Sequence, residues 1–156
     1  MQTPATKKLD QLGLKWIGHE YLHDPAVKDF GQEASRELGV DADRVFKTLI
    51  VKTEIGLVVG VLPVSQMLDV KALAMVCGAK KGEMADVSDA ERSSGYVHGG
   101  ISPVGQRKTL RTVIDGSAQS FPTIYVSGGR RGFDIEVAPE DLAAACGAQF
   151  APIARR

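Results

Sequence analysis

Apolar and polar positions alternate over several short stretches of the chain. Between these stretches lie segments whose apolar residues recur at the spacing of a helix. A period of two predicts strands, and Gly56 lies where a hairpin turn is expected between the first two of them. The predicted strands cover residues 44–53, 53–64, 110–115, 122–128 and 132–138. Apolar spacing with Pro or Asp at the start and Gly at the end predicts the helices. They cover residues 4–12, 30–39, 69–77, a short stretch near Ser88, and 139–146.

Strands and short helices follow each other without a strict βαβ rhythm. This order favours an α+β fold over a doubly wound parallel sheet. The chain has 156 residues, of which 44% are hydrophobic, and neither a linker nor a repeat interrupts it. We therefore predict one domain over residues 1–156, with a core large enough to need no disulfide.

One predicted strand carries a lysine on the face that should be buried. In RVFKTLIVKT, residues 44–53, Lys47 shares a face with Val45, Leu49 and Val51, because side chains alternate between the faces of a strand. An unpaired ammonium group in an apolar interior costs on the order of several kcal/mol. Lys47 therefore either reaches water from the strand or lies in a polar pocket with a function.

Charge is balanced over the whole chain but not along it. The 19 basic and 19 acidic residues give a formal net charge of zero, which argues against a protein that coats nucleic acid by charge alone. The segment 102–132 nevertheless has five basic residues against one acidic residue, a net charge of +4. It surrounds two glycine loops, HGGISPVGQRK and YVSGGRRG, whose backbone amides can approach an anion closely. An anionic ligand is therefore favoured over a merely solvated surface.

The two cysteines predict packing rather than chemistry. Cys77 and Cys146 both occur as Cys-Gly-Ala after an apolar helical run, where glycine stops the helix.

We find no signal peptide and no apolar run near the roughly 20 residues of a membrane span. The expected location is the cytoplasm, without membrane contact.

The segment HEYLH, residues 19–23, fits the H-E-x-x-H pattern of zinc proteases. That chemistry needs a helix to place both histidines on one side of the metal. Gly18 and Pro25 flank the segment and disfavour a helix. We expect an extended segment with His19, Tyr21 and His23 on one face, and neither a metal nor another cofactor.

Several motifs in order resemble one family. EYLHDP, VFKTLIV, GAKKGEMAD, GGISPVGQ, TIYVSGG and GFDIE resemble the YbaK family of Cys-tRNA(Pro) deacylases, relatives of the editing domain of bacterial prolyl-tRNA synthetase. The resemblance implies a compact, mixed, β-barrel-like sheet flanked by short helices. It also implies a hydrolase that edits mischarged Cys-tRNA(Pro) in trans, with prolyl-tRNA synthetase as a partner.

The resemblance assigns roles to particular residues. Lys47 would lie in the pocket for the 3′ end of an aminoacylated tRNA, and the substrate's own thiol would attack the ester. Within the glycine loop, our own candidates for donors that stabilise the developing oxyanion are the amides of Gly99, Gly100 and Ile101. The expected substrate-binding residues are Tyr21, Ser102, Ser127, Gly128, Gly129 and Asp134, with Asp134 holding the α-ammonium group. The basic segment around the two glycine loops supplies the expected tRNA contacts, Arg107, Lys108, Arg130 and Arg131.

Two alternatives remain open on the same fold. The protein could deacylate another mischarged aminoacyl-tRNA. It could also be a module that binds an aminoacyl end without cleaving it, although Lys47 together with the GGISP loop disfavours this.

Overall fold

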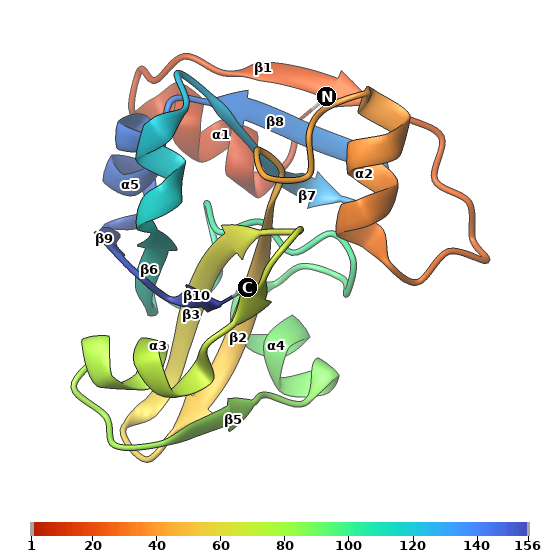
Figure 1. The fold of residues 1–156 in the computed structure, drawn as a ribbon. Helices are drawn as coiled ribbons and strands as arrows, with labels where there is room; N and C mark the ends of the chain where they lie inside the picture. The colour runs from red at the N-terminus through yellow and green to blue at the C-terminus, as the bar shows by residue number, and fades with distance from the viewer. Residues whose placement is uncertain (1, 156) are drawn as a thin grey trace.

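The computed structural model describes residues 2–155 as short helices around three β-sheets (Figure 1). The α-helices are α1 (Pro4–Gln11), α2 (Phe30–Leu38), α3 (Val70–Val76), α4 (Val87–Ser94) and α5 (Pro139–Cys146), with a 3-10 helix at Gly116–Ser120. The strands are β1 (Ile17–Glu20), β2 (Phe46–Thr53), β3 (Gly56–Pro63), β4 (Met67–Leu68), β5 (Gly82–Met84), β6 (Arg111–Asp115), β7 (Ile124–Arg130), β8 (Phe133–Val137), β9 (Gln149–Ala151) and β10 (Ala154–Arg155).

The sheets contain five, three and two strands. Their orders are β5-β2-β3-β6-β9, β1-β8-β7 and β10-β4. The predicted β2–β3 hairpin is confirmed, and it pairs Lys47 with Leu62. The α+β class is also confirmed, but within residues 2–155 the sheets are open and form no closed barrel.

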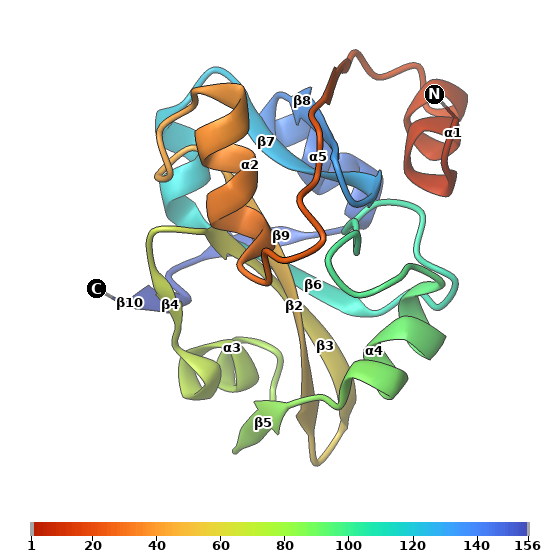
Figure 2. The same cartoon turned by 90° about the vertical axis from the view of Figure 1, so that its right-hand side faces the viewer.

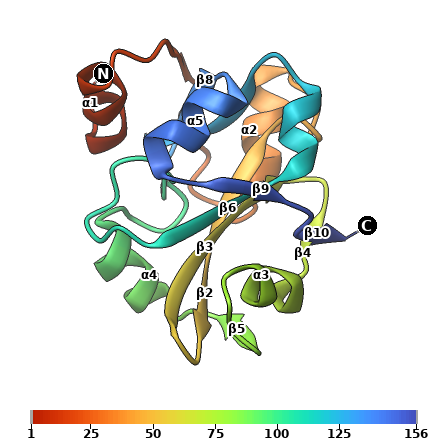
Figure 3. The ribbon, with the colours of Figure 1, turned by 90° about the vertical axis from the view of Figure 1, so that its left-hand side faces the viewer.

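The two larger sheets meet at the upper end of the long hairpin. Figure 1 shows the three-stranded sheet above, with β2 and β3 running down to α3, α4 and β5. In Figure 2, α2 lies on one side of the upper part of the molecule, and the loop that follows α4 lies on the other. Figure 3 shows β6 and β9 side by side across β3, as their parallel pairings require. An isolated bridge between Val45 and Tyr125 connects the start of β2 to β7.

Three clusters of buried side chains hold these layers together. The first lies under the three-stranded sheet and includes Leu9, Phe133 and Leu142. The second packs α3 against the five-stranded sheet. The third is smaller and joins α2 to the start of β2 and to β7, through Ala34, Val45, Val64 and Tyr125. It positions α2 above the junction of the two sheets.

Local signals in the sequence explain the helix ends. The side chains of Thr3, Asp29 and Asp69 accept hydrogen bonds from backbone amides at the starts of α1, α2 and α3. Gly39 ends α2 in the left-handed conformation that glycine tolerates best. Thr3 Oγ1 also donates to the carbonyl of Gly128 at 2.5 Å, which ties the start of α1 to β7.

The short strands β4 and β5 and the 3-10 helix were not predicted. Each is short and lacks a clear alternation of apolar and polar residues. Among the described helices, none combines the length and the apolar character required to cross a lipid bilayer.

Candidate functional site

A pocket of about 290 Å³ opens where the two larger sheets, α2 and the loop after α4 meet. β2 supplies one wall, including Lys47 and Thr48, and Asp134 and Ser127 come from the three-stranded sheet. The start of α2 adds Asp29 and Phe30. Other residues that line the pocket include Tyr21, Met84, Val87, His98, Gly99 and Ile101. Residues from distant parts of the sequence therefore share one concave site, as ligand pockets commonly do.

Lys47 lies in this pocket and not in the core. Its side chain is half-buried, and within residues 2–155 it makes no hydrogen bond or ion pair. Burial lowers the pKa of the Lys47 ammonium, and the nearby Asp29 carboxylate partly offsets this. A phosphate or a polarised carbonyl in the pocket would stabilise the charged form. The lysine that interrupts the apolar pattern of β2 therefore lines the pocket in which a ligand would bind.

Asp134 forms a second polar wall, on the other sheet. Its side chain is buried, with 5% relative exposure, and its carboxylate accepts no hydrogen bond from the described residues. Burial raises the pKa of Asp134 to about 7, and His19 partly offsets the rise. A buried carboxyl with this pKa can accept an ammonium group, which would restore its charge.

Tyr21 and Ser127 lie next to Asp134. Ser127 is paired with Asp134 in the β7–β8 register, and the Ser127 hydroxyl accepts a hydrogen bond from the Gly129 amide at 3.2 Å. The Tyr21 amide donates to the carbonyl of Gly132 at 2.9 Å, which fixes the chain after β1. Burial raises the pKa of the Tyr21 phenol, and Asp134 adds to this effect, so the hydroxyl remains a neutral hydrogen-bond donor.

The loop at residues 98–101 brings two of the three predicted oxyanion donors to the pocket. Gly99 has a φ of +89°, and a Cβ atom there would lie 2.7 Å from the Phe30 ring. Gly99 and Ile101 line the pocket, and their amides donate to no described acceptor. The Gly100 amide donates to the carbonyl of Val97 at 2.8 Å. The Gly100 amide is therefore already engaged in a turn, and its role as an oxyanion donor stays a prediction.

Three other predicted binding residues, Ser102, Gly128 and Gly129, lie outside the pocket lining, and their binding role stays a prediction. Ser102 is fully buried, lies outside the pocket lining, and its hydroxyl accepts a hydrogen bond from the Val104 amide at 3.2 Å. Gly128 and Gly129 form an irregularity between Ser127 and Arg130, where the backbone approaches other side chains. A Cβ atom at Gly128 would lie 2.4 Å from Phe133, and one at Gly129 would lie 2.9 Å from Tyr96.

The four predicted tRNA contacts are exposed but have different surroundings. The Arg131 guanidinium lies over the Phe30 ring at 5.2 Å, and its Nε donates to the carbonyl of His98 at 2.7 Å. It therefore lies close to two pocket residues. Arg130 pairs with Glu20 at 2.6 Å on the three-stranded sheet. Arg107 and Lys108 follow α4 and donate backbone hydrogen bonds to the last residues of that helix.

The HEYLH segment is not helical, as predicted. β1 ends at Glu20, so the prediction that His23 shares a strand face with His19 is wrong. The two imidazoles have different partners: His19 lies 2.9 Å from Glu136, and His23 lies 2.6 Å from Glu33. Over residues 2–155 no three His, Cys, Asp or Glu side chains gather as a metal site would require.

Both cysteines end helices, as their Cys-Gly-Ala context predicts. Cys77 is the C-cap of α3 and Cys146 is the last residue of α5. Burial raises the pKa of the Cys146 thiol to about 12, and its Sγ donates to the carbonyl of Pro103 at 3.3 Å. Neither thiol lines the pocket.

Several residues of the pocket were not predicted as site residues. Asp29 was not predicted as a pocket residue, because an aspartate before an amphipathic helix is commonly an N-cap. Phe30 and His98 gain their roles only from the contact between α2 and the glycine loop. Thr48 Oγ1 is buried beside Lys47 and has no hydrogen-bond partner within the described range.

The fold and this pocket define an aminoacyl-tRNA editing domain, and a model of the family of that description matches residues 24–145. The chain belongs to this family. It is 42% identical over 123 residues to EbsC of Enterococcus faecalis, which is named as a Cys-tRNA(Pro)/Cys-tRNA(Cys) deacylase. The match covers 78% of this chain and 75% of EbsC.

Two solved structures share the whole architecture. One is described as the hypothetical protein APE2540, with a TM-score of 0.87, 26% identity, and coverage of 98% of this chain and 100% of that chain. The other is described as a trans-editing enzyme for prolyl-tRNA synthetase, with a TM-score of 0.82 and 22% identity, and each chain is fully covered. The second likeness supports the fold alone, because its identity is low.

Proposed function

We propose that this protein is a trans-editing deacylase that removes cysteine from mischarged Cys-tRNA(Pro). The observation that carries the proposal is the placement of Lys47 and Asp134 on different sheets but in one pocket. One is a cation available for a phosphate or an ester, and the other is a buried acceptor for an α-ammonium group. An aminoacyl ester at the 3′ end of a tRNA presents all of these groups. The 42% identity to EbsC supports cysteine as the amino acid.

The proposed reaction needs no protein nucleophile, since the aminoacyl ester is already activated. The substrate thiol sulfur attacks the ester carbonyl carbon, the carbon–oxygen bond to the ribose breaks, and the thiol proton passes to the ribose oxygen. The products are uncharged tRNA and a cysteine thiolactone, which water opens to cysteine. Fixing the thiol against the carbonyl can lower the barrier by several kcal/mol, and oxyanion donors lower it further.

Each wall of the pocket has a part in this step. Lys47 would hold the terminal phosphate or the ester, and Asp134 would bind the α-ammonium group, with Tyr21 and Ser127 beside it. The amides of Gly99 and Ile101 would face the developing oxyanion. Arg131 lies next to Phe30 and His98, and Arg107, Lys108 and Arg130 would add weaker backbone contacts with tRNA.

Prolyl-tRNA synthetase is the proposed partner. The protein has zero formal net charge and one modest basic segment, so it should bind tRNA weakly and with little base readout. Selection of tRNA(Pro) would then come from the synthetase. A strong preference of the isolated protein for Cys-tRNA(Pro) over Cys-tRNA(Cys) would contradict this partner.

A single-turnover assay tests the function. Cys-tRNA(Pro), Ala-tRNA(Pro) and Pro-tRNA(Pro) are each mixed with excess protein, and loss of the ester is followed. Rapid loss of cysteine alone is the expected result. Equal loss of alanine would exclude the thiol mechanism and indicate a deacylase of broader range, and binding without turnover would indicate a recognition module.

A further inference from the structure

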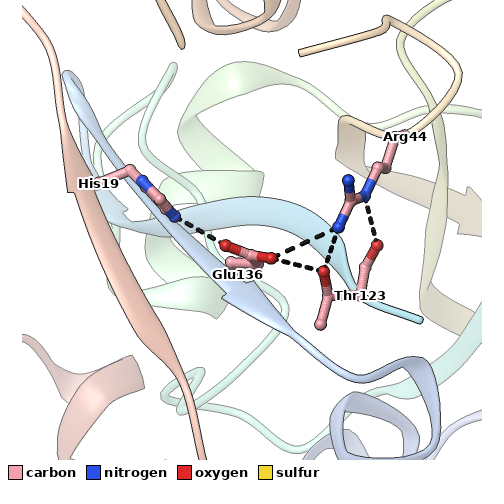
Figure 4. A network of polar contacts seen from close by, with 4 residues as sticks. All are labelled: His19, Arg44, Thr123 and Glu136. Atoms are coloured by element: carbon pink, nitrogen blue, oxygen red, sulfur yellow. Dashed lines mark hydrogen bonds and ion pairs between the residues drawn. The ribbon is translucent and has the colours of Figure 1, made fainter. Parts of the chain in front are cut away.

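A polar network joins the segment just before β2 to the three-stranded sheet (Figure 4). Val45, next to Arg44 in the chain, lines the pocket. Arg44, just before β2, donates from Nε to the carbonyl of Thr123 at 2.7 Å and from Nη2 to the Thr123 hydroxyl. The same Nη2 lies 3.4 Å from Glu136 Oε2 on β8. The Thr123 hydroxyl donates to Glu136 Oε2 at 2.6 Å, and His19 of β1 lies 2.9 Å from Glu136 Oε1.

The backbone reinforces this connection. The Tyr125 amide donates to the carbonyl of Arg44 at 3.1 Å, and the Arg44 guanidinium lies over the Tyr125 ring at 5.3 Å. Val45 bridges to Tyr125, and its carbonyl accepts from the Val64 amide at 2.8 Å. The start of β2 is thus held against β7 by side chain and backbone together.

Each anchor of the network is close in sequence to a pocket residue. Glu136 and Asp134 are two residues apart on β8, so their side chains leave the same face of the sheet. Tyr125 and Ser127 have the same relation on β7. Arg44 precedes Lys47 by three residues, and the intervening bridge passes from Val45 to Tyr125. A shift of Arg44 relative to Glu136 therefore displaces Lys47 relative to Asp134.

We propose that Arg44, Thr123 and Glu136 act as positioning residues that set the distance between Lys47 and Asp134 across the pocket. The inference rests on the proposed deacylase function. None of the three lines the pocket, so their effect on the substrate is exerted through β2 and β8. Hydrogen bonds from Thr123 and His19 lower the pKa of Glu136, which keeps its carboxylate charged opposite Arg44.

The arrangement of donors distinguishes this role from simple charge pairing. Arg44 uses two nitrogens of its planar guanidinium on Thr123 and reaches Glu136 with one of them. A lysine keeps the positive charge but cannot reproduce this fork. Glutamine at position 136 keeps an oxygen acceptor for Thr123 and Arg44, whereas alanine removes it.

The experiment measures deacylation of Cys-tRNA(Pro) and the melting temperature for Arg44→Lys, Glu136→Gln and Glu136→Ala. We expect Arg44→Lys and Glu136→Ala to lower kcat about 10- to 100-fold with little change in KM, the effect of a small misplacement of reacting groups. Glu136→Gln should keep most of the parental kcat. Arg111→Lys is the matched control, because Arg111 also donates from Nη2 to a carbonyl and a side chain, those of Val76 and Gln149, remote from the pocket. It should keep parental kcat.

A double-substitution cycle separates positioning from general damage to the fold. If Arg44 acts through Lys47, adding Arg44→Lys to Lys47→Met should cause no further loss of residual turnover. Multiplicative losses, or a folded Arg44→Lys variant with parental kcat, would overturn the inference. If the parent itself does not deacylate Cys-tRNA(Pro), the proposed function fails first, so the two failures are distinguishable.

Discussion

Lys47 on β2 and Asp134 on β8 belong to different sheets, yet both line the same pocket. Lys47 is a half-buried cation whose pKa is lowered, and Asp134 is a buried carboxyl whose pKa is raised. Burial makes the charged form of each side chain less favourable than in water, and a ligand of opposite charge would stabilise that charged form. This relationship leads to the first two predictions.

Lys47→Met should fold as well as the parent, or better, and lose most of its deacylation. The substitution keeps much of the volume and removes a half-buried charge, and such replacements are often neutral or stabilising. A thermal melt and single-turnover deacylation are measured on the same preparation. Lys52→Met is the matched control, because Lys52 is an exposed lysine on the same strand. A variant that melts much lower, or retains parental turnover, would show that Lys47 is structural.

Asp134→Asn should raise stability at alkaline pH and weaken substrate binding. The folded-state pKa of about 7 lies above the ordinary 3.8, so the stabilising effect of the neutral carboxyl is complete below about pH 4 and is lost as the pH rises through 7. A shift of this size corresponds to roughly 4 kcal/mol. Asparagine never ionises and escapes this loss.

Melts of Asp134→Asn and of the parent should therefore agree below about pH 4 and diverge by pH 8, with the variant more stable. The KM for Cys-tRNA(Pro) should rise, because the acceptor for the α-ammonium group loses its charge. Asp10→Asn is the control, since Asp10 is exposed and an asparagine oxygen can still accept from Trp16. Parallel melting curves for Asp134→Asn and the parent at every pH would contradict the burial argument.

Ser127→Ala and Ser102→Ala should have opposite consequences. Ser127 borders the pocket, and its loss should lower kcat/KM about fivefold, the size of one hydrogen bond. Ser102 is fully buried away from the pocket, and its loss strands the Val104 amide and should cost about 1–2 kcal/mol of stability. Urea unfolding and turnover per folded molecule are the two measurements. Reversed outcomes would restore Ser102 to the binding site.

Cys146→Ala and Cys77→Ala should keep parental turnover, with some loss of stability. Burial raises the pKa of both thiols, so neither forms a thiolate nucleophile readily. Single-turnover rates are compared with melting temperatures. A well-folded variant without turnover would require a covalent acyl-enzyme intermediate.

Removal of metal should not affect deacylation. His19 and His23 are directed to different carboxylates, Glu136 and Glu33. The assay is repeated after prolonged dialysis against chelator, with zinc added back to one portion. Activity that disappears on dialysis and returns only with zinc would overturn this expectation.

Sequence reasoning succeeded where one residue contradicted its local pattern. Lys47 interrupts an apolar strand face, and the helix ends follow from caps and glycines that act over a few residues. It could not show which backbone amides a local turn engages or which contacts join distant segments. The Gly100 amide donates to Val97 in a turn and Ser102 is buried, although the surrounding loop was correctly predicted as irregular. Arg44 and Glu136 are 92 positions apart, and no local pattern connects them.

The hydrogen bond between Thr3 and Gly128 spans 125 positions of the sequence, and the pocket combines Tyr21 and Lys47 with Asp134. Ribosomes synthesise a chain from its amino end at about 5–20 residues per second. In a growing polypeptide, β2 with Lys47 is therefore synthesised several seconds before β8 with Asp134. Newly made chains should be unable to bind the charged tRNAs that crowd the translating ribosome until β8 has emerged and docked.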